Sequence, residues 1–151
     1  MKKAKYIVLL AFAAFSSCNP DNGIDSDCFI PDVNVNLTIN MDLPEYFRLQ
    51  NLGEYIAFDA GIKGVYVIHN YDDYFYALER TCPYQSDNEC ARVEIDDEVL
   101  QIRCGTTVDT GFEQCCASTY AFSSGFLTGP TRCNLKTYRV SRSGNTIYVS
   151  N

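Results

Sequence analysis

The sequence predicts a mainly β protein whose strands form an antiparallel sandwich or small barrel. Short runs rich in tyrosine, valine and isoleucine recur along the chain, with turn residues between them. No long apolar pattern with the period of a helix is present. Several short strands at close spacing are typical of these two architectures.

Eight segments are expected to be strands, because each combines β-branched or aromatic residues with flanking turn residues. Two hairpins are explicit, one through Asn70-Tyr71-Asp72-Asp73 and one through Ser143-Gly144-Asn145. Glycine and asparagine in such turns supply the positive φ that tight hairpins need. The expected strands are residues 33–39, 55–58, 65–69, 75–79, 93–95, 99–103, 137–141 and 146–149.

The first seventeen residues have the order of an export signal. Three lysines form a basic start, and residues 6–15 form an apolar run that is too short to span a bilayer as a stable helix. Small residues then lead into Cys18, and this order resembles the lipobox of bacterial lipoproteins. The resemblance implies that residues 1–17 are a lipoprotein signal peptide, cleaved before an acylated Cys18. The alternative is an ordinary secretory signal with a chance cysteine.

Residues 18–28 are expected to be a lipidated tether, because they are polar and rich in turn formers, and residues 29–151 to be one folded β domain. Several acyl chains can hold a protein on a membrane where one gives marginal binding. The expected location is therefore the bacterial cell envelope, with the lipid in the membrane. Asn19 follows the lipid cysteine, which by resemblance to a sorting rule of some Gram-negative bacteria favours the outer membrane.

The charge of the exported chain is strongly negative. Loss of the leader removes three of the twelve basic residues and leaves nine against nineteen acidic ones, a formal charge of −10. Such a surface disfavours nucleic acid and anionic lipid as partners. Eleven tyrosines and nine phenylalanines are expected mostly in the core, although an exposed tyrosine cluster would suit a protein or glycan partner that the sequence does not identify.

Cysteine is the most informative residue type in this chain. Seven cysteines follow Cys18, so at least one thiol is expected to be unpaired, ligated or modified if all pairing is intramolecular. An exported protein meets an oxidising compartment, in which disulfides persist. Adjacent Cys115 and Cys116 are too close for a relaxed disulfide, and in an extended segment their side chains point to opposite faces. The seven are Cys28, Cys82, Cys90, Cys104, Cys115, Cys116 and Cys133.

Two cysteine segments resemble the ligand loops of Rieske iron–sulfur domains. The first is Cys82-Pro83-Tyr84, which follows a Tyr-Ala-Leu stretch, and the second runs from Cys115 to Phe122. The turn at 125–130 and the closing hairpin also follow the order of that family. The family takes one cysteine and one histidine from each loop. The resemblance therefore implies an antiparallel Rieske-like domain with two cysteine loops at one tip.

Both histidines of that family are replaced in this chain. Tyr84 stands at the first histidine position and Ser118 at the second, with Cys82 and Cys115 at the cysteine positions. Cys104 also follows a strand as a ligand cysteine would, so it is an alternative counterpart of Cys115. The sequence contains one histidine, His69, which lies in an expected strand. It is interpreted as structural, because a Rieske iron needs two imidazoles and this chain has one.

Three hypotheses for the loops follow from these replacements. In the first, there is no cofactor and the cysteines form disulfides. In the second, an all-cysteine 2Fe–2S cluster forms with ligands among the five central cysteines. In the third, the same thiolates hold zinc, although no paired Cys-x-x-Cys spacing is present. The five central cysteines are Cys82, Cys90, Cys104, Cys115 and Cys116.

These observations favour a lipid-anchored, disulfide-braced binding or structural module, with an electron-transfer protein carrying a cysteine-rich 2Fe–2S cluster as the alternative. An enzyme is the third choice, because neither an acid/base pair nor a cofactor motif stands out. A serine–histidine–aspartate triad lacks a nucleophile-elbow sequence.

Overall fold

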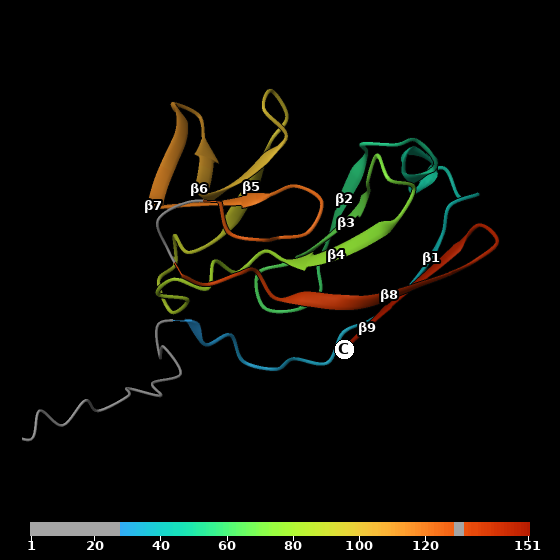
Figure 1. The fold of residues 1–151 in the computed structure, drawn as a ribbon, viewed down its shortest axis with the longest axis horizontal. Coiled ribbons are helices and arrows are strands. Elements are labelled where there is room, and N and C mark those ends of the chain that lie inside the picture. The colour runs from blue at the N-terminus through green and yellow to red at the C-terminus, as the bar shows by residue number, and fades with distance from the viewer. Residues whose placement is uncertain (1–27, 129–131) are drawn as a thin grey trace, which may run out of the picture.

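Two antiparallel β-sheets, one of six strands and one of three, form the part of the chain that the computed structural model describes, residues 28–128 and 132–151 (Figure 1). The expected signal peptide, Cys18, residues 19–27 of the tether and Gly129-Pro130 lie outside this part. No helix in the described ranges is long and apolar enough to cross a membrane. The prediction of a mainly β, antiparallel fold is confirmed.

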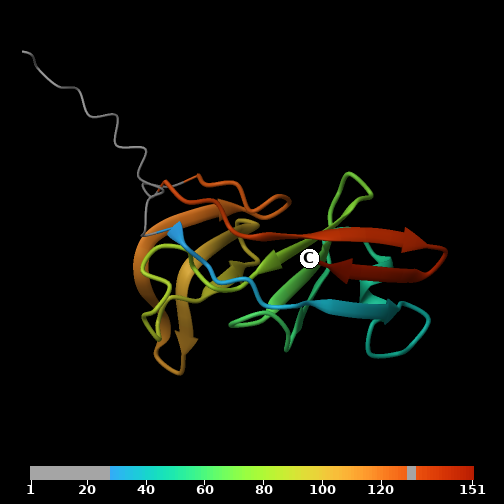
Figure 2. The same cartoon turned by 90° about the horizontal axis from the view of Figure 1, so that it is seen from below.

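The six-stranded sheet has the order β1-β9-β8-β4-β3-β2, and every neighbouring pair is antiparallel. Its outer part, β1, β8 and β9, lies at one end of the molecule, away from the small sheet (Figure 1 and Figure 2). The strands are β1 (Asn36–Asn40), β2 (Tyr55–Phe58), β3 (Val65–His69), β4 (Phe75–Glu79), β8 (Thr137–Ser143) and β9 (Thr146–Ser150).

The three-stranded sheet has the order β5-β6-β7, and its strands are β5 (Val93–Asp96), β6 (Gln101–Val108) and β7 (Gly111–Ala121). A short 3-10 helix, η2 (Phe47–Gln50), follows β1. Three expected strands, at 55–58, 65–69 and 75–79, have the observed bounds, while the others start or end a few residues away. The sheets therefore contain every expected strand and one additional strand, β7.

β7 corrects the expectation that the second cysteine segment is a loop. Residues 115–121 belong to β7, which pairs with β6 on either side of residues 115–118. Its sequence gives little sign of a strand, because Glu113, Gln114 and the two cysteines interrupt any alternation of apolar and polar residues. Backbone pairing with β6 makes it a strand, which is a long-range effect that local pattern does not contain.

β3 is buried along its whole length because it packs on both faces. Alternate residues belong to two separate cores, as the period-two geometry of a strand requires. The first, here called the outer core, comprises Val35, Ile39, Met41, Leu49, Val65, Val67, Ala77, Tyr138, Ile147 and Val149. The second, here called the junction core, lies between the sheets and comprises Tyr66, Ile68, Leu78, Cys82, Ala91, Val93, Ile102, Cys104, Tyr120, Phe122 and Leu135.

Candidate functional site

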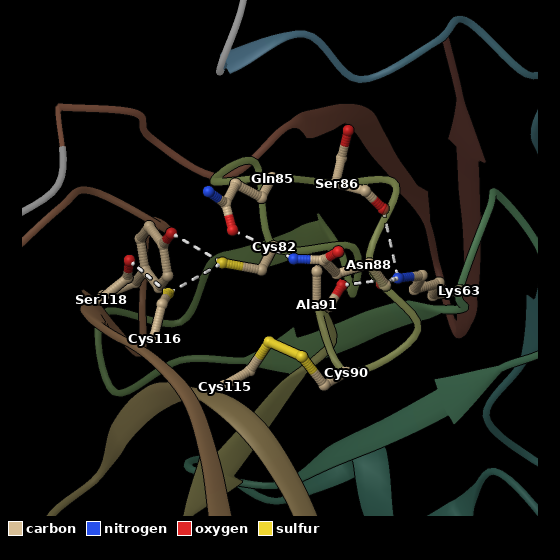
Figure 3. Close-up of a disulfide and its surroundings, with 11 residues drawn as sticks. Lys63, Cys82, Gln85, Ser86, Asn88, Cys90, Ala91, Cys115, Cys116 and Ser118 are labelled. Carbon is tan, nitrogen blue, oxygen red and sulfur yellow. Dashed lines mark hydrogen bonds between the residues drawn. A yellow bond between two sulfur atoms is a disulfide. The ribbon is translucent and has the colours of Figure 1, made fainter.

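The first cysteine segment begins directly after β4, where Thr81 bridges Arg92. Cys82 is fully buried, and its backbone N–H donates to the carbonyl of Ala91 at 3.0 Å, which closes residues 82–91 into a loop. The Lys63 ammonium group donates to three carbonyls of this loop, those of Ser86, Asn88 and Ala91 (Figure 3). A single cation thus fixes the backbone that positions Cys82.

A large irregularity in the β6–β7 ladder creates the second part of the site. Arg103 pairs with Thr119, and Gly105 pairs with Gln114, so Cys104 of β6 faces the four residues 115–118 of β7. Gly105 has a φ of +152°, and a Cβ there would lie 2.2 Å from the carbonyl oxygen of Glu113, so no other residue fits without a shift. Such bulges re-aim side chains next to functional sites.

Three thiols converge at this irregularity. The sulfurs of Cys82, Cys104 and Cys116 all lie within 4.8 Å of one another. Those of Cys82 and Cys116, which Figure 3 draws, are 3.6 Å apart. Cys82 and Cys104 are fully buried, whereas Cys116 is half-buried. Each thiol comes from a different element: the loop after β4, the strand β6 and the strand β7. We call these three residues the thiol cluster.

Two hydroxyl groups contact the thiol cluster. The Tyr120 hydroxyl lies 3.5 Å from the sulfur of Cys82, and the Ser118 hydroxyl lies 2.8 Å from the sulfur of Cys116. The thiol of Cys104 hydrogen-bonds Cys82 and thereby lowers the pKa of Cys82, against the effect of burial; the hydroxyl of Tyr120 contributes in the same direction. The same hydrogen bond and burial raise the pKa of Cys104, so Cys82 is the first of the pair to ionise.

Two disulfides brace the region around the thiol cluster. Cys90 of the first cysteine loop is bonded to Cys115 of β7, with 5.5 Å between their Cα atoms (Figure 3). Cys28 is bonded to Cys133, with 5.4 Å between their Cα atoms. Cys115 and its neighbour Cys116 therefore take different partners, as expected for adjacent residues of a strand.

A small cavity of about 90 Å³ opens beside two members of the thiol cluster. Cys104 and Cys116 line it, together with the side chain of Arg103 on the same strand as Cys104. Ser118 and Gln114 belong to the lining as well. The cavity therefore lies beside the fully buried Cys104 and the half-buried Cys116.

The positions predicted from the Rieske resemblance lie around the thiol cluster. Tyr84 packs against the junction core, and Ser118 is buried against Cys116. Cys115 forms a disulfide with Cys90. Cys104, which the sequence indicates only as an alternative, is one of the three clustered thiols. Its place directly after an expected strand is the sequence signal for this role.

His69 lies at the end of β3, in a setting of its own. Its Nε2 is 3.0 Å from Asp73 Oδ1 in the following turn, and its ring stacks on Phe75 with 4.1 Å between centroids. Its side chain is almost fully buried by these contacts. The donor set at the site therefore does not fit a Rieske cluster, because Tyr84 and Ser118 offer no imidazole and Cys115 offers no thiol.

Comparison with known proteins gives a weak match in shape alone. No family model matches this chain, and no curated protein matches it. Among solved structures, the ferredoxin of carbazole 1,9a-dioxygenase from Nocardioides aromaticivorans IC177 is 21% identical, with a TM-score of 0.44 over 78% of this chain and 97% of that chain. The likeness at this level does not assign a role to any residue of this chain.

Proposed function

We propose that this chain is a lipid-anchored domain of the bacterial envelope that retains a Rieske-like architecture, lacks a histidine-ligated cluster and acts as a disulfide-braced binding or structural module. One observation carries the proposal. Cys115, the residue that the resemblance places at the cysteine position of the second ligand loop, is bonded to Cys90 and has no free thiol. Tyr84 and Ser118 at the histidine positions would have to lose protons of high pKa to ligate iron well, a phenol near about 10.

The disulfide pattern supports a bracing role. Cys90–Cys115 ties the loop after β4 to β7, and therefore joins the two sheets through the segment that carries Cys82. Cross-linking residues 25 apart contributes about 3 kcal/mol in the chain-entropy treatment. A domain braced in this way presents a rigid surface, which suits binding or scaffolding outside the cell membrane, where disulfides persist.

Iron and sulfide analysis of the full chain, purified from the envelope of an expressing bacterium, tests the cluster-free part of the proposal. We expect well below one iron atom per chain and no visible charge-transfer absorption. Non-reducing peptide mapping should recover the Cys90–Cys115 cross-link. Stoichiometric iron and sulfide would contradict the proposal.

The architecture is tested from the opposite side by restoring both histidines. A Tyr84→His/Ser118→His/Cys90→Ser variant frees Cys115 and supplies both imidazoles. If the resemblance places the residues correctly, anaerobic reconstitution should produce a reddish 2Fe–2S chromophore. The matched control is Cys90→Ser alone, which frees the same thiol without adding imidazole and should remain colourless; colour in this control would instead support an all-cysteine cluster. No chromophore in the triple variant, despite native-like circular dichroism, would contradict the assigned positions.

The anchoring part rests on the ordered leader and on Cys18. Cys18→Ala should abolish incorporation of a labelled fatty acid and leave the protein as unprocessed precursor or released material. The control is Cys28→Ala, because Cys28 lies outside the lipobox and is bonded to Cys133. Equal label in wild type and Cys18→Ala would contradict the lipoprotein assignment. Density fractionation of the membranes tests the outer-membrane location that Asn19 favours.

A second candidate function is electron transfer through an all-cysteine 2Fe–2S cluster. The specific observation in its favour is the thiol cluster, which already supplies three of the four sulfurs that such a cluster takes. Opening of the Cys90–Cys115 disulfide would supply the fourth. Iron and sulfide in the purified protein, with a low reduction potential, would establish this function in place of the first.

A further inference from the structure

We propose that the thiol cluster, Cys82, Cys104 and Cys116, is a zinc site in which three thiolates bind one Zn²⁺ ion and the cavity supplies a solvent molecule as fourth ligand. The inference deepens the proposed function and rests on it, because an iron–sulfur cluster would occupy the same sulfurs. It assigns the unpaired thiols of a chain whose other described cysteines, Cys28, Cys90, Cys115 and Cys133, are paired.

The spacing of the sulfurs fits a shared ion. Four-coordinate zinc binds cysteine sulfur at about 2.3 Å, which places two sulfurs of a tetrahedral site about 3.8 Å apart. Cys82 and Cys116 are 3.6 Å apart, and every pair in the cluster lies within 4.8 Å. Closure onto one ion therefore requires about 1 Å of movement at most in any sulfur–sulfur distance. Half-buried Cys116 is the residue with room for this adjustment.

The surroundings of the sulfurs suit thiolates. A thiolate carries no proton, so in the bound form the hydroxyls of Tyr120 and Ser118 must be the donors in their contacts with Cys82 and Cys116. Donors of this kind orient metal ligands and contribute to affinity. The three ligands are held from three elements, and Cys90–Cys115 fixes β7 immediately next to Cys116.

The charge around the site favours a divalent ion. Three thiolates with Zn²⁺ leave one net negative charge, whereas a monovalent ion would leave two in a largely buried place, at a higher desolvation cost. The ammonium group of Lys63 interacts electrostatically with both Cys82 and Cys104. The guanidinium group of Arg103 borders the cavity as well, but it is paired with Asp96 at 3.1 Å. Lys63 is therefore the cation that offsets part of the remaining negative charge.

The cavity offers space for the fourth ligand of the zinc ion. Zinc with three protein ligands takes water or a small ligand in its fourth position. The cavity of about 90 Å³ is lined by two of the three ligand residues, Cys104 and Cys116, so we place the solvent ligand on this side of the cluster. The same opening is the entry path for the metal.

The test uses the full chain, purified from the envelope of bacteria grown with added zinc and without chelators. Zinc, iron, acid-labile sulfide and free thiols are measured on the same sample. We expect about one zinc and no iron per chain, and three thiols that become reactive only after denaturation with a chelator. Replacement of zinc by Co²⁺ should give the intense near-ultraviolet absorption of thiolate-to-cobalt charge transfer.

Variants then assign the ligands. Cys116→Ser and Cys104→Ser should each weaken Co²⁺ binding by about 100-fold or more and reduce the charge-transfer intensity. The matched control is the double variant Cys28→Ser/Cys133→Ser, which removes a disulfide outside the thiol cluster and should still bind one Co²⁺. Circular dichroism shows which variants fold. Cys116 is half-buried, so its variant tests the site even if Cys104→Ser fails to fold.

The possible failures are distinguishable. A folded protein with three free thiols and less than about a tenth of a zinc per chain would overturn the zinc site and leave the cluster-free module standing. A disulfide between any two of Cys82, Cys104 and Cys116 in the purified protein would do the same. Two iron atoms and two sulfides per chain would overturn both proposals together.

Discussion

Each sheet borders a buried polar centre, and the two centres differ in the partners that surround their polar atoms. At the end of β4, the carboxylate of Glu79 accepts hydrogen bonds from Tyr138, Thr81 and the backbone N–H groups of Ile62 and Lys63. In the junction core the thiol cluster has hydroxyl groups and other thiols around it. Sulfur is a weak donor and acceptor, so these contacts are weaker than the hydrogen bonds at Glu79. The first centre is therefore satisfied by strong hydrogen bonds, whereas the second is the zinc site that we propose.

The two centres are also neighbours along the chain. Only two residues separate Glu79 from Cys82. Burial opposes ionisation of Glu79, but the hydrogen bonds from Tyr138, Lys63, Thr81 and Ile62 outweigh it and lower its pKa. Gly61 makes room for the carboxylate, since a Cβ there would lie 2.2 Å from Glu79 Oε2. The rigid carboxylate centre thus anchors the backbone from which the thiol centre starts.

Removal of the carboxylate should give the largest effect. Glu79→Ala removes the acceptor of the buried Tyr138 hydroxyl and of buried Thr81, and that of two partly buried backbone N–H groups. We expect the free energy of unfolding to fall by about 3–5 kcal/mol, measured by chemical denaturation under non-reducing conditions. The control is Glu45→Ala at an exposed position, expected within about 0.5 kcal/mol of wild type. A Glu79→Ala variant as stable as the control would contradict a structural role.

Removal of the disulfide beside the thiol cluster should have the second-largest effect on stability. Cys90→Ser/Cys115→Ser removes a cross-link between residues 25 apart, and we expect it to lower the free energy of unfolding by about 3 kcal/mol. It should also speed alkylation of the metal-free thiols, since β7 is then no longer bonded to the loop of residues 82–91. Mass spectrometry after iodoacetamide treatment measures this rate. Unchanged stability and labelling would show that ladder pairing alone holds the site.

The contribution of a single hydrogen bond to the carboxylate centre can be tested at Tyr138. Tyr138 donates to Glu79 at 2.6 Å, and burial raises the pKa of Tyr138, with the Glu79 carboxylate adding to this. Tyr138→Phe should therefore lower the free energy of unfolding by about 2 kcal/mol, the scale of a hydrogen bond to a charged group. Tyr148→Phe, at a position 44% exposed, is the control and should leave stability nearly unchanged. Equal effects of the two variants would count against a strong bond at Glu79.

Acid provides the smallest and most specific test. The pKa of Glu79 is lower in the folded chain than its usual value of 4.5, so the stability that it contributes is complete above that usual value. This contribution is lost as the pH falls through the folded pKa. The difference in unfolding free energy between wild type and Glu79→Gln should therefore shrink as the pH drops below 4.5. A difference that stays constant to pH 2 would contradict the lowered pKa.

Local sequence pattern specifies much of the fold. The strands at 55–58, 65–69 and 75–79 have the expected bounds, and both expected hairpins connect neighbouring strands. Alternation of side chains and turn chemistry are properties of a few consecutive residues, so one sequence contains them. Seven cysteines follow Cys18, so intramolecular pairing among them leaves at least one sulfur unpaired, and three of them are unpaired in the described part of the chain.

Long-range pairing sets which cysteines meet. The sequence resemblance places Cys115 opposite Cys82, whereas the structure bonds Cys115 to Cys90 and places Cys116 against Cys82. Adjacent residues of a strand point to opposite faces, so it is Cys116 and not Cys115 whose side chain points toward Cys82. This arrangement arises from the irregular pairing of β6 with β7, in which Cys104 faces residues 115–118.

The amino-acid sequence alone predicts a β fold, its hairpins and an exported, cysteine-rich chain whose Rieske-like ligand positions lack histidine. Three features emerge only in the folded chain: β7 is a strand, the disulfides join Cys28 to Cys133 and Cys90 to Cys115, and three other sulfurs lie together. The difference is one of range. Strand and turn preferences act over a few residues, whereas the thiol cluster brings together Cys82, Cys104 and Cys116 through the register of three separate elements.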